Sequence, residues 1–470
     1  MLSVANNVTS VMAQHNLNKA STGVAKSVEK LSSGLKINRG ADGPAALVIS
    51  EKHRAQIAGL AQAIDNTEKA SSVVQTAEGA LNEINSLLVK VRTLAIDSAN
   101  SGVNDDDALA ANQAEITNAL DTINRIANNT QFGEKKLLDG SSGVSGTATD
   151  ADVTVLKANS STTAGTYAVA VTTVGERAKQ QAGTAQTAVL AADEILTINN
   201  VTVGLSAGMS QSQVSDRINE FTSQTGVKSD INGGFTRVYS EAFGASESLS
   251  IVSNITGAAT SSGLGTALLT DSGVDVVGTI NAVSYNGVGS VLTSNSGVTK
   301  GLSIQFAESS GANAFETVTG AQGNVTVADN SLVFQIGANK NQTANIAIAK
   351  VNPNGLGLGV AGNQYSNLNE IEVTSGTKAQ DALAVIDAAI DDVTNLRGAL
   401  GAFQANTLES TANNLRATLE NTINAESVIR DTDFASEIAK FTKGQVLVQA
   451  GTAMLSNANQ IPQSILSLLR

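Results

Sequence analysis

Residues 60–99 read LAQAIDNTEKASSVVQTAEGALNEINSLLVKVRTLAIDSA, and the spacing of their apolar residues indicates how both ends of the chain fold. Apolar or small residues recur every three or four positions, which places them on one face of a helix in a near-heptad repeat. They are Leu60, Ile64, Thr67, Val74, Ala77, Leu81, Ile84, Leu88, Val91 and Ala95. If this coiled-coil helix is continuous over 44–99, it is roughly 84 Å long at ~1.5 Å per residue.

A shorter apolar face precedes this helix and predicts another helix that ends near residue 35. Its residues are Leu17, Val24, Val28, Leu31 and Leu35. The pattern breaks over residues 36–43, and Gly34, Gly40 and Gly43 permit a reversal here that a continuous helix would not. Pro44 suits the first turn of the next helix, because its missing N–H costs nothing there. We expect 36–43 to be a connector, with a plain helix break as the alternative.

A polar segment, residues 100–107, follows the long helix. Its residues 104–107, Asn-Asp-Asp-Asp, fit an N-cap and an acidic first turn at the positive end of a further helix. The same run also fits a solvated acidic loop. The next helical face is formed by Leu109, Gln113, Ile116, Leu120, Ile123 and Ala127.

The C-terminal part repeats the helical spacing. One face comprises Leu383, Ile386, Ile390, Val393, Leu396, Leu400 and Phe403, and weaker heptads continue through Leu408, Leu415, Leu419 and Ile423. After 431–433 a further amphipathic stretch carries Phe434, Ile438, Phe441, Val448, Leu455 and Ala458. Both ends of the chain are therefore predicted to be long helical arms.

The middle, residues 141–376, has a different character. It is rich in Thr, Ser, Gly, Val and Asn in short alternating runs, such as 195–198 and 323–327, which indicate strands and turns. One short helix is expected over 212–224, with Gly226 as its stop. The fold class predicted is α+β: a long antiparallel coiled-coil bundle built from both termini, with an inserted, mainly β middle of one or two domains.

The composition excludes several classes of function. Cysteine is absent, which excludes disulfides and thiolate metal sites. The formal net charge of −13 argues against nucleic-acid binding, which needs clustered Lys and Arg. No apolar run approaches the ~20 residues of a membrane-spanning helix, so no membrane insertion is expected. The first 21 residues lack the features of a secretory signal, so we expect any export to occur without a cleaved signal peptide.

No motif in the sequence indicates a catalytic function. The two histidines, His15 and His53, are 38 positions apart in the helical arms, and the middle contains none. One G-x-S-x-G match occurs, at 204–208 (GLSAG), but the middle has no histidine that could activate its serine. There is no GxxxxGK[ST] loop, and Asp391 with Asp392 fits a solvated helix face better than an acid/base pair. We expect no enzyme activity, no cofactor and no metal.

Several stretches resemble bacterial flagellin. Residues 31–38, LSSGLKIN, match the family signature L-S-S-G-L-R/K-I-N, and 41–45, ADGPA, stand where the family has A-x-D-D-A-A. Residues 81–99, 130–132 (TQF) and the closing 464–470 (SILSLLR) are also similar. The resemblance covers roughly the first 140 and last 95 residues. In the middle, 198–203 (INNVTV) looks like the short repeat of inserted flagellin domains.

The resemblance implies a filament subunit for swimming motility that is exported unfolded through the flagellar type III secretion channel to the extracellular filament. It implies five segments: 1–43, an inner-tube helix and spoke; 44–140, outer-tube helices; 141–376, a surface-exposed β region; 377–430, an outer-tube helix; and 431–470, an inner-tube helix. The expected partners are further copies of the chain, an export chaperone at the C-terminal arm, and the filament cap and hook-junction proteins.

The apolar faces of the arms predict an assembly surface, since exposed apolar stripes of this length mark interfaces. In a free subunit these faces would have no third partner, so we expect disordered arms before polymerisation and helical arms after it. The residues predicted for assembly are Leu31, Leu35, Ile64, Leu81, Leu88, Leu94, Ile390, Phe434, Ile438, Phe441, Leu455, Leu466, Leu468, Leu469 and Arg470.

By resemblance, a second surface corresponds to the patch that an innate immune receptor recognises in many flagellins. It comprises Leu88, Val89, Lys90, Arg92, Leu94 and Glu115. Lys90 stands where that group has Arg and Val89 where it has Gln, and lysine cannot reproduce a planar bidentate contact. We therefore expect weaker receptor activation, with packing between subunits as the alternative role of these residues.

Two other functions stay open on the sequence. A hook–filament junction protein would share the terminal helices but be incorporated in few copies. The middle could also be a carbohydrate-binding or adhesive module displayed on a filament.

Overall fold

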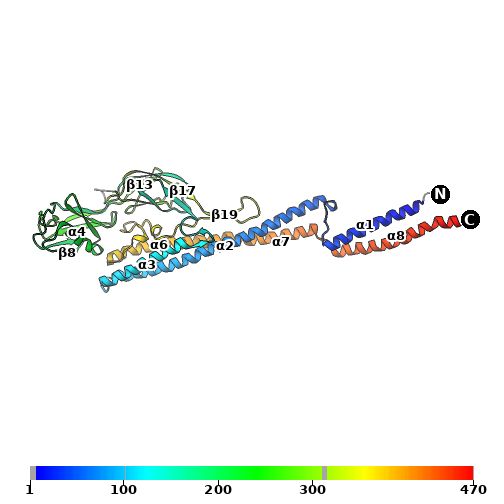
Figure 1. Ribbon diagram of the computed structural model, residues 1–470, viewed down its shortest axis with the longest axis horizontal. Coiled ribbons are helices and arrows are strands. Elements are labelled where there is room, and N and C mark those ends of the chain that lie inside the picture. Colours follow the sequence, from blue (N-terminus) through cyan, green and yellow to red (C-terminus); the bar gives the residue numbers. More distant parts are fainter. Residues whose placement is uncertain (1–6, 101, 310–314, 469–470) are drawn as a thin grey trace. The chain divides into compact units, whose positions relative to one another are not determined.

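The structure is a computed structural model that describes residues 7–100, 102–309 and 315–468, with side chains described up to residue 460. The chain folds as two compact units (Figure 1). The first comprises Met1–Glu68, Gln335–Thr343 and Glu409–Arg470, and the second Lys69–Phe334 and Ala344–Leu408. Helix α2 (Pro44–Ser98) contributes to both units.

The first unit is built from helices that pair antiparallel. Helix α1 (Val8–Ser33) lies beside α8 (Phe434–Leu468), and the two run in opposite directions (Figure 1). The first part of α2 lies beside α7 (Ser410–Arg430), joined by the ion pairs Arg430–Glu51 at 3.2 Å and Arg416–Glu68 at 2.7 Å. The predicted antiparallel arrangement of the two arms is confirmed.

The predicted break between the first two helices is also confirmed. Helix α1 ends at Gly34, whose φ of 72° is left-handed and whose N–H donates to the carbonyl of Lys30. A left-handed C-cap favours glycine, since a side chain would be strained there. A 3₁₀ turn, η1 (Gly40–Asp42), follows, and α2 begins at Pro44 as expected.

A small hydrophobic cluster holds α2 to α7. It comprises Leu60, Ala63, Ile64 and Leu415, with Ala338 and Leu419 packed against it. Ala338 belongs to the hairpin between β18 (Leu332–Gln335) and β19 (Thr343–Ile346). The hairpin lies close to the helix at Gly59, where an added Cβ would be 3.2 Å from Cβ of Ala338. Nothing in the heptad pattern predicted this contact.

In the second unit, the rest of α2 lies with α3 (Asp106–Asn129) and α6 (Gly376–Ala402). Asp105 caps α3 by accepting a hydrogen bond from the N–H of Ala108, and Asp106 and Asp107 lie in its first turn. This confirms the N-cap interpretation of 104–107 over the solvated loop. Arg92 of α2 donates to Asp387 of α6 at 2.6 Å.

One departure from the expected C-terminal helix is a π-helical segment, Phe403–Glu409, between α6 and α7. Buried residues of α6 follow helical spacing up to Val393, and Leu400 comes one heptad later, but the next buried residue is Leu408, eight positions after Leu400. A π-helix accommodates an extra residue by forming i→i+5 hydrogen bonds. The π-helical segment therefore takes up the extra residue, so that the apolar face continues into α7 without an end to the helix.

The β region of the second unit consists of small sheets. Their strand orders are β1 (Gln131–Phe132)–β2 (Lys135–Lys136); β6 (Lys179–Gln181)–β10 (Phe235–Ser240)–β9 (Val227–Asn232); β12 (Leu269–Ser272)–β11 (Ser248–Ser253)–β7 (Glu194–Ile198)–β8 (Val201–Leu205); β14 (Val283–Asn286)–β13 (Val277–Ile280)–β5 (Gly165–Thr173)–β17 (Gly320–Asp329)–β3 (Val144–Ala148); and β15 (Val291–Thr293)–β16 (Ser303–Phe306)–β4 (Val153–Lys157). The pairs of the four larger sheets are antiparallel. The strands predicted at 195–198 and 323–327 lie within β7 and β17.

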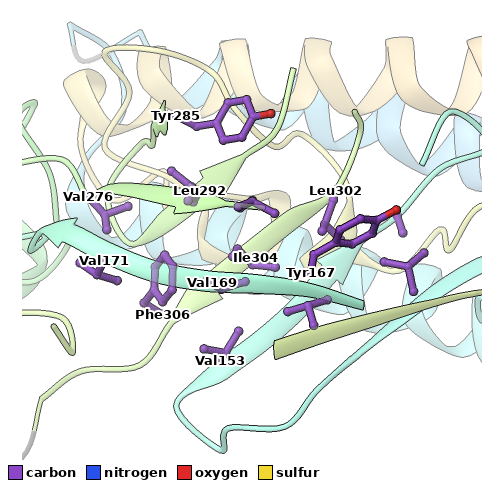
Figure 2. Close-up of a cluster of buried hydrophobic side chains, with 14 of the residues drawn as sticks. Val153, Tyr167, Val169, Val171, Val276, Tyr285, Leu292, Leu302, Ile304 and Phe306 are labelled. Carbon is purple, nitrogen blue, oxygen red and sulfur yellow. The ribbon is translucent and has the colours of Figure 1, made fainter. Parts of the chain in front are cut away.

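Two hydrophobic cores stabilise these sheets. The first, shown in Figure 2, includes Phe306, Ile304 and Leu292 packed with Val169 and Val171 of β5. The second joins strands β7 to β11 with helix α4 (Gln211–Glu220). The predicted helix over 212–224 is divided at Phe221 into α4 and α5 (Thr222–Thr225), and Gly226 ends it with a left-handed φ of 71°.

Candidate assembly site

The paired helices α1 and α8 are joined by hydrogen bonds at both ends. Near the chain termini, Asn7 donates to the carbonyl of Ala458 at 2.9 Å and Ser10 donates to Asn459 at 2.7 Å. At the other end, Ser27 donates to Glu437 at 2.7 Å in a buried contact. These contacts set the register of the two helices.

Two glycines of α8 let the helices approach closely. A Cβ added at Gly444 would lie 2.8 Å from Cγ2 of Val24, and one at Gly451 would lie 3.3 Å from Cδ1 of Leu17. Real Cβ atoms do not approach as closely as the first distance, so Val24 packs against α8 only because residue 444 has no side chain. Gly444 and Gly451 are one heptad apart and therefore lie on the same face of the helix.

Glu437 is the buried acidic group of the helix pair. The hydrogen bond from Ser27 holds the pKa of this carboxyl below its ordinary value, and the Lys440 ammonium at 3.2 Å acts in the same direction. Burial opposes both effects. Glu437 is therefore a charged partner for Ser27 near neutral pH.

The segment that follows α1 and the segment that precedes α8 run side by side. The N–H of Lys36 donates to the carbonyl of Arg430 at 2.7 Å, and the N–H of Thr432 donates to the carbonyl of Gly34 at 2.9 Å. Leu35 and Asp431 form an antiparallel β-bridge. The segment predicted as a connector is thus hydrogen-bonded to the segment that joins α7 and α8.

Much of the apolar surface of α1 and α8 stays exposed although the helices pack on each other. Met12 is 61%, Leu447 51% and Met454 65% exposed, and these three side chains line a shallow groove between the helices. Other large apolar residues exposed on the pair are Val8, Val11, Val28, Phe434, Ile438 and Val446. Large apolar side chains exposed in this number on a helix pair are typical of a protein–protein interface.

The residues predicted for assembly fall into three groups. Phe434 and Ile438 are exposed, whereas Leu31, Leu35, Leu94, Ile390, Phe441 and Leu455 are half-buried. Ile64, Leu81 and Leu88 are buried inside the chain itself, the last two completely. The side chains of Leu466 and Leu468, and the whole of Leu469 and Arg470, lie outside the described residues.

The residues predicted as a receptor patch do not all share one surface. Lys90 and Glu115 lie together, with the ammonium 2.6 Å from the carboxylate, and Arg92 pairs with Asp387. Val89 is exposed, but Leu88 points into the protein and is completely buried. Both cations of the patch are therefore engaged within the subunit.

The sequence reasoning missed the contacts that join α1 to α8: Ser27, Glu437, Gly444 and Gly451. Ser27 and Glu437 are single polar residues, and no local pattern distinguishes them from the many exposed ones. The seven-residue spacing of the two glycines was a usable signal for close helix packing.

Two findings on the described part of the chain concern metal binding and membrane insertion. No three His, Asp or Glu side chains there gather as a set of metal ligands. Among the helices of residues 7–100, 102–309 and 315–468, none has an apolar stretch sufficient to cross a bilayer.

Comparison with known proteins identifies the family. The bacterial flagellin N-terminal helical region matches residues 4–143, and the C-terminal helical region matches 383–469. The chain is 31% identical to a flagellin of Salmonella typhimurium, covering 99% of each chain. It is 32% identical to a flagellin of Clostridium tyrobutyricum, covering 98% of this chain and 100% of the relative. It is also 32% identical to the B-type flagellin of Pseudomonas aeruginosa, covering 100% of each chain.

These matches run through the β middle as well as the helical arms, and they favour a flagellin over a hook-junction protein. The family is one of structural proteins whose members form the extracellular flagellar filament. The chain belongs to the bacterial flagellins and is a structural subunit of the flagellar filament that polymerises with copies of itself.

Proposed function

We propose that the exposed apolar face of α1 and α8 is the surface through which subunits join in the filament. Segments 1–43 and 431–470 then form the inner tube and its spoke, 44–140 and 377–430 form the outer tube, and 141–376 faces the solvent. The half-buried Leu31, Leu35, Phe441 and Leu455 complete the interface at its edges, together with the terminal residues Leu466, Leu468, Leu469 and Arg470.

The observation that carries this proposal is the exposure of Met12, Leu447 and Met454 along one groove. Fully burying a side chain of this size contributes about 1.5–3 kcal/mol. Several such residues per subunit can offset the entropy of ordering the arms. Ile64, Leu81 and Leu88 are buried within the subunit. We therefore propose that they stabilise its fold and do not form the assembly surface for which they were predicted.

Leu447→Asp together with Met454→Lys tests the proposal. Both residues are exposed, so the double variant keeps the β middle folded but fails to polymerise, as measured by sedimentation and electron microscopy. Val189→Lys, at an exposed apolar position of the middle that faces the solvent, is the matched control and assembles normally. Deleting 466–470 is expected to abolish assembly as well. Filaments of normal yield from the double variant would contradict the proposal.

We further propose that the chain is exported through the flagellar type III channel, with a chaperone holding the C-terminal arm beforehand. The exposed Ile438, Val446 and Leu447 on α8 support this, because a free apolar helix face of this kind aggregates unless it is covered. Co-purification of the chaperone with the full chain, lost on deletion of 431–470, tests the idea. The filament cap and hook-junction proteins are expected to contact the same arms in the filament.

For the immune receptor we propose weak recognition. Lys90 offers a point charge that is already paired with Glu115, and Val89 offers no hydrogen bond. Val89→Gln with Lys90→Arg is therefore expected to raise potency in a cell reporter assay. Equal potency of the two proteins would refute this account.

A further inference from the structure

A cleft of about 450 Å³ lies in the second unit. Its walls come from strand β16, the loop between β10 and β11, and the segment before α6. Phe243, Phe306 and Tyr365 give it aromatic surface, and several charged side chains line the rest. This volume falls in the range typical of sites for small molecules.

The charged groups of this cleft are partnered within the protein, with one exception. The partnered groups are Arg177 with Glu308 (3.0 Å), Lys378 with Glu372 (2.5 Å), Glu241 with Lys228 (2.6 Å), and Glu370 with Asn367 (2.7 Å). Among the described residues, no side chain forms a hydrogen bond or ion pair with the carboxylate of Glu247. Glu247 is therefore the one carboxylate of this lining to which the described residues offer neither a hydrogen bond nor an ion pair.

The surroundings of Glu247 make this unmatched charge costly. Burial raises its pKa to about 7. The groups that face it include Lys378 and Asp381 of α6, Glu241 of the β10–β11 loop and Arg177 before β6; the two cations lower the pKa and the two carboxylates raise it. Glu308, Glu370 and Glu372 line the same cleft. A cation placed beside Glu247 would supply the missing partner.

We propose that this cleft binds a small organic cation, a primary amine with an apolar stem, whose ammonium group pairs with Glu247 while the stem lies against Phe243 and Tyr365. A divalent metal ion fits less well, because it needs several free oxygen ligands and the other carboxylates are already engaged. A neutral ligand would leave the carboxylate unmatched.

Calorimetric titration of the full chain with n-butylamine tests the proposal. Only ionised Glu247 pairs with the amine, so binding is about 30-fold weaker at pH 5.5 than at pH 8, and near pH 7 it releases a proton to the buffer. A wild-type chain without saturable binding at pH 8, or with binding that does not depend on pH, overturns the proposal. This measurement needs no variant and so does not depend on whether a variant folds.

Glu247→Gln, compared with Glu134→Gln, separates a built site from attraction to the acidic chain as a whole. Each variant removes one negative charge, and Glu134 is exposed. Glu247→Gln is expected to lose at least tenfold in affinity and to lose the proton release, whereas Glu134→Gln retains both. Equal effects of the two substitutions would show that the amine responds only to net charge, and would overturn the proposal.

Discussion

Ser27 of α1 donates a hydrogen bond of 2.7 Å to Glu437 of α8, and each residue is only 6% exposed. This is a buried polar contact between the two helices whose outer faces are apolar. Apolar contacts alone would let the helices slide relative to each other, whereas a buried hydrogen bond requires one register. The register in turn determines which apolar residues remain on the outside.

Ser27→Ala is expected to destabilise the helix pair by about 1–3 kcal/mol, because it leaves a buried carboxylate oxygen without its donor. Filaments of the variant should depolymerise at a lower temperature than wild-type filaments, as followed by circular dichroism. Ser21→Ala, at an exposed position of α1, is the control and should change the midpoint little. An unchanged midpoint for Ser27→Ala would mean that the contact does not set the register.

Acidification is expected to weaken the same helix pair. The pKa of Glu437 is lowered from its ordinary value of 4.5, chiefly by the hydrogen bond from Ser27. A carboxylate with a lowered pKa contributes stability above the ordinary value, and this contribution is lost as the pH falls through the lowered pKa. Melting filaments between pH 6 and pH 3 measures the decline, which should be smaller in Glu437→Gln. Identical pH profiles for the two proteins would contradict the assignment.

Leu88 and Val89 are adjacent but should respond differently to truncation. Leu88→Ala removes a completely buried side chain and is expected to cost about 2–5 kcal/mol in the free energy of unfolding. Val89 is 47% exposed, and Val89→Ala should change that free energy by no more than about 0.5 kcal/mol. Denaturant unfolding of unpolymerised subunits measures both. Similar losses for the two variants would disprove the division into a buried and an exposed face.

Ala282 offers a site for stabilisation. The two-residue loop between β13 and β14 places Asn281 at φ 53° and Ala282 at φ 62°, a left-handed conformation that costs alanine roughly 1–2 kcal/mol. Glycine suits this second position of the hairpin turn. Ala282→Gly is expected to raise the stability of the β region by about 1 kcal/mol in thermal unfolding. Asn200→Gly, in the equivalent turn between β7 and β8, is the control and should have a smaller effect, because asparagine tolerates its φ of 67°. A decrease in stability for Ala282→Gly would contradict the prediction.

The α-helical arms could be predicted from sequence because their signals are local. Every apolar position on the stripe of 60–99 is buried or nearly so, and the caps at Gly34, Pro44 and Asp105 lie where the helices begin or end. The π-helical segment also has a local signal, the eight-residue step from Leu400 to Leu408. That step alone did not distinguish a bulge from a weaker heptad.

The candidate site was only partly predictable. Leu88 and Ile438 both belong to apolar stripes of the same period, yet one is completely buried and the other is 52% exposed. Periodicity places a residue on a face of its helix but says nothing about what covers that face. The unmatched Glu247 had no signal at all, because its cleft is formed by segments far apart in the chain.

The sequence by itself determined that both ends are helical, where several of the helices start or stop, and that the middle is mainly β. Spacing, caps and turn residues act over a few positions, so the chain carries this information locally. Only the tertiary structure decided that the apolar stripe of α2 is buried within the subunit, whereas α1 and α8 keep exposed apolar side chains. Burial depends on which segments meet in space, and neighbouring positions along the chain do not determine that.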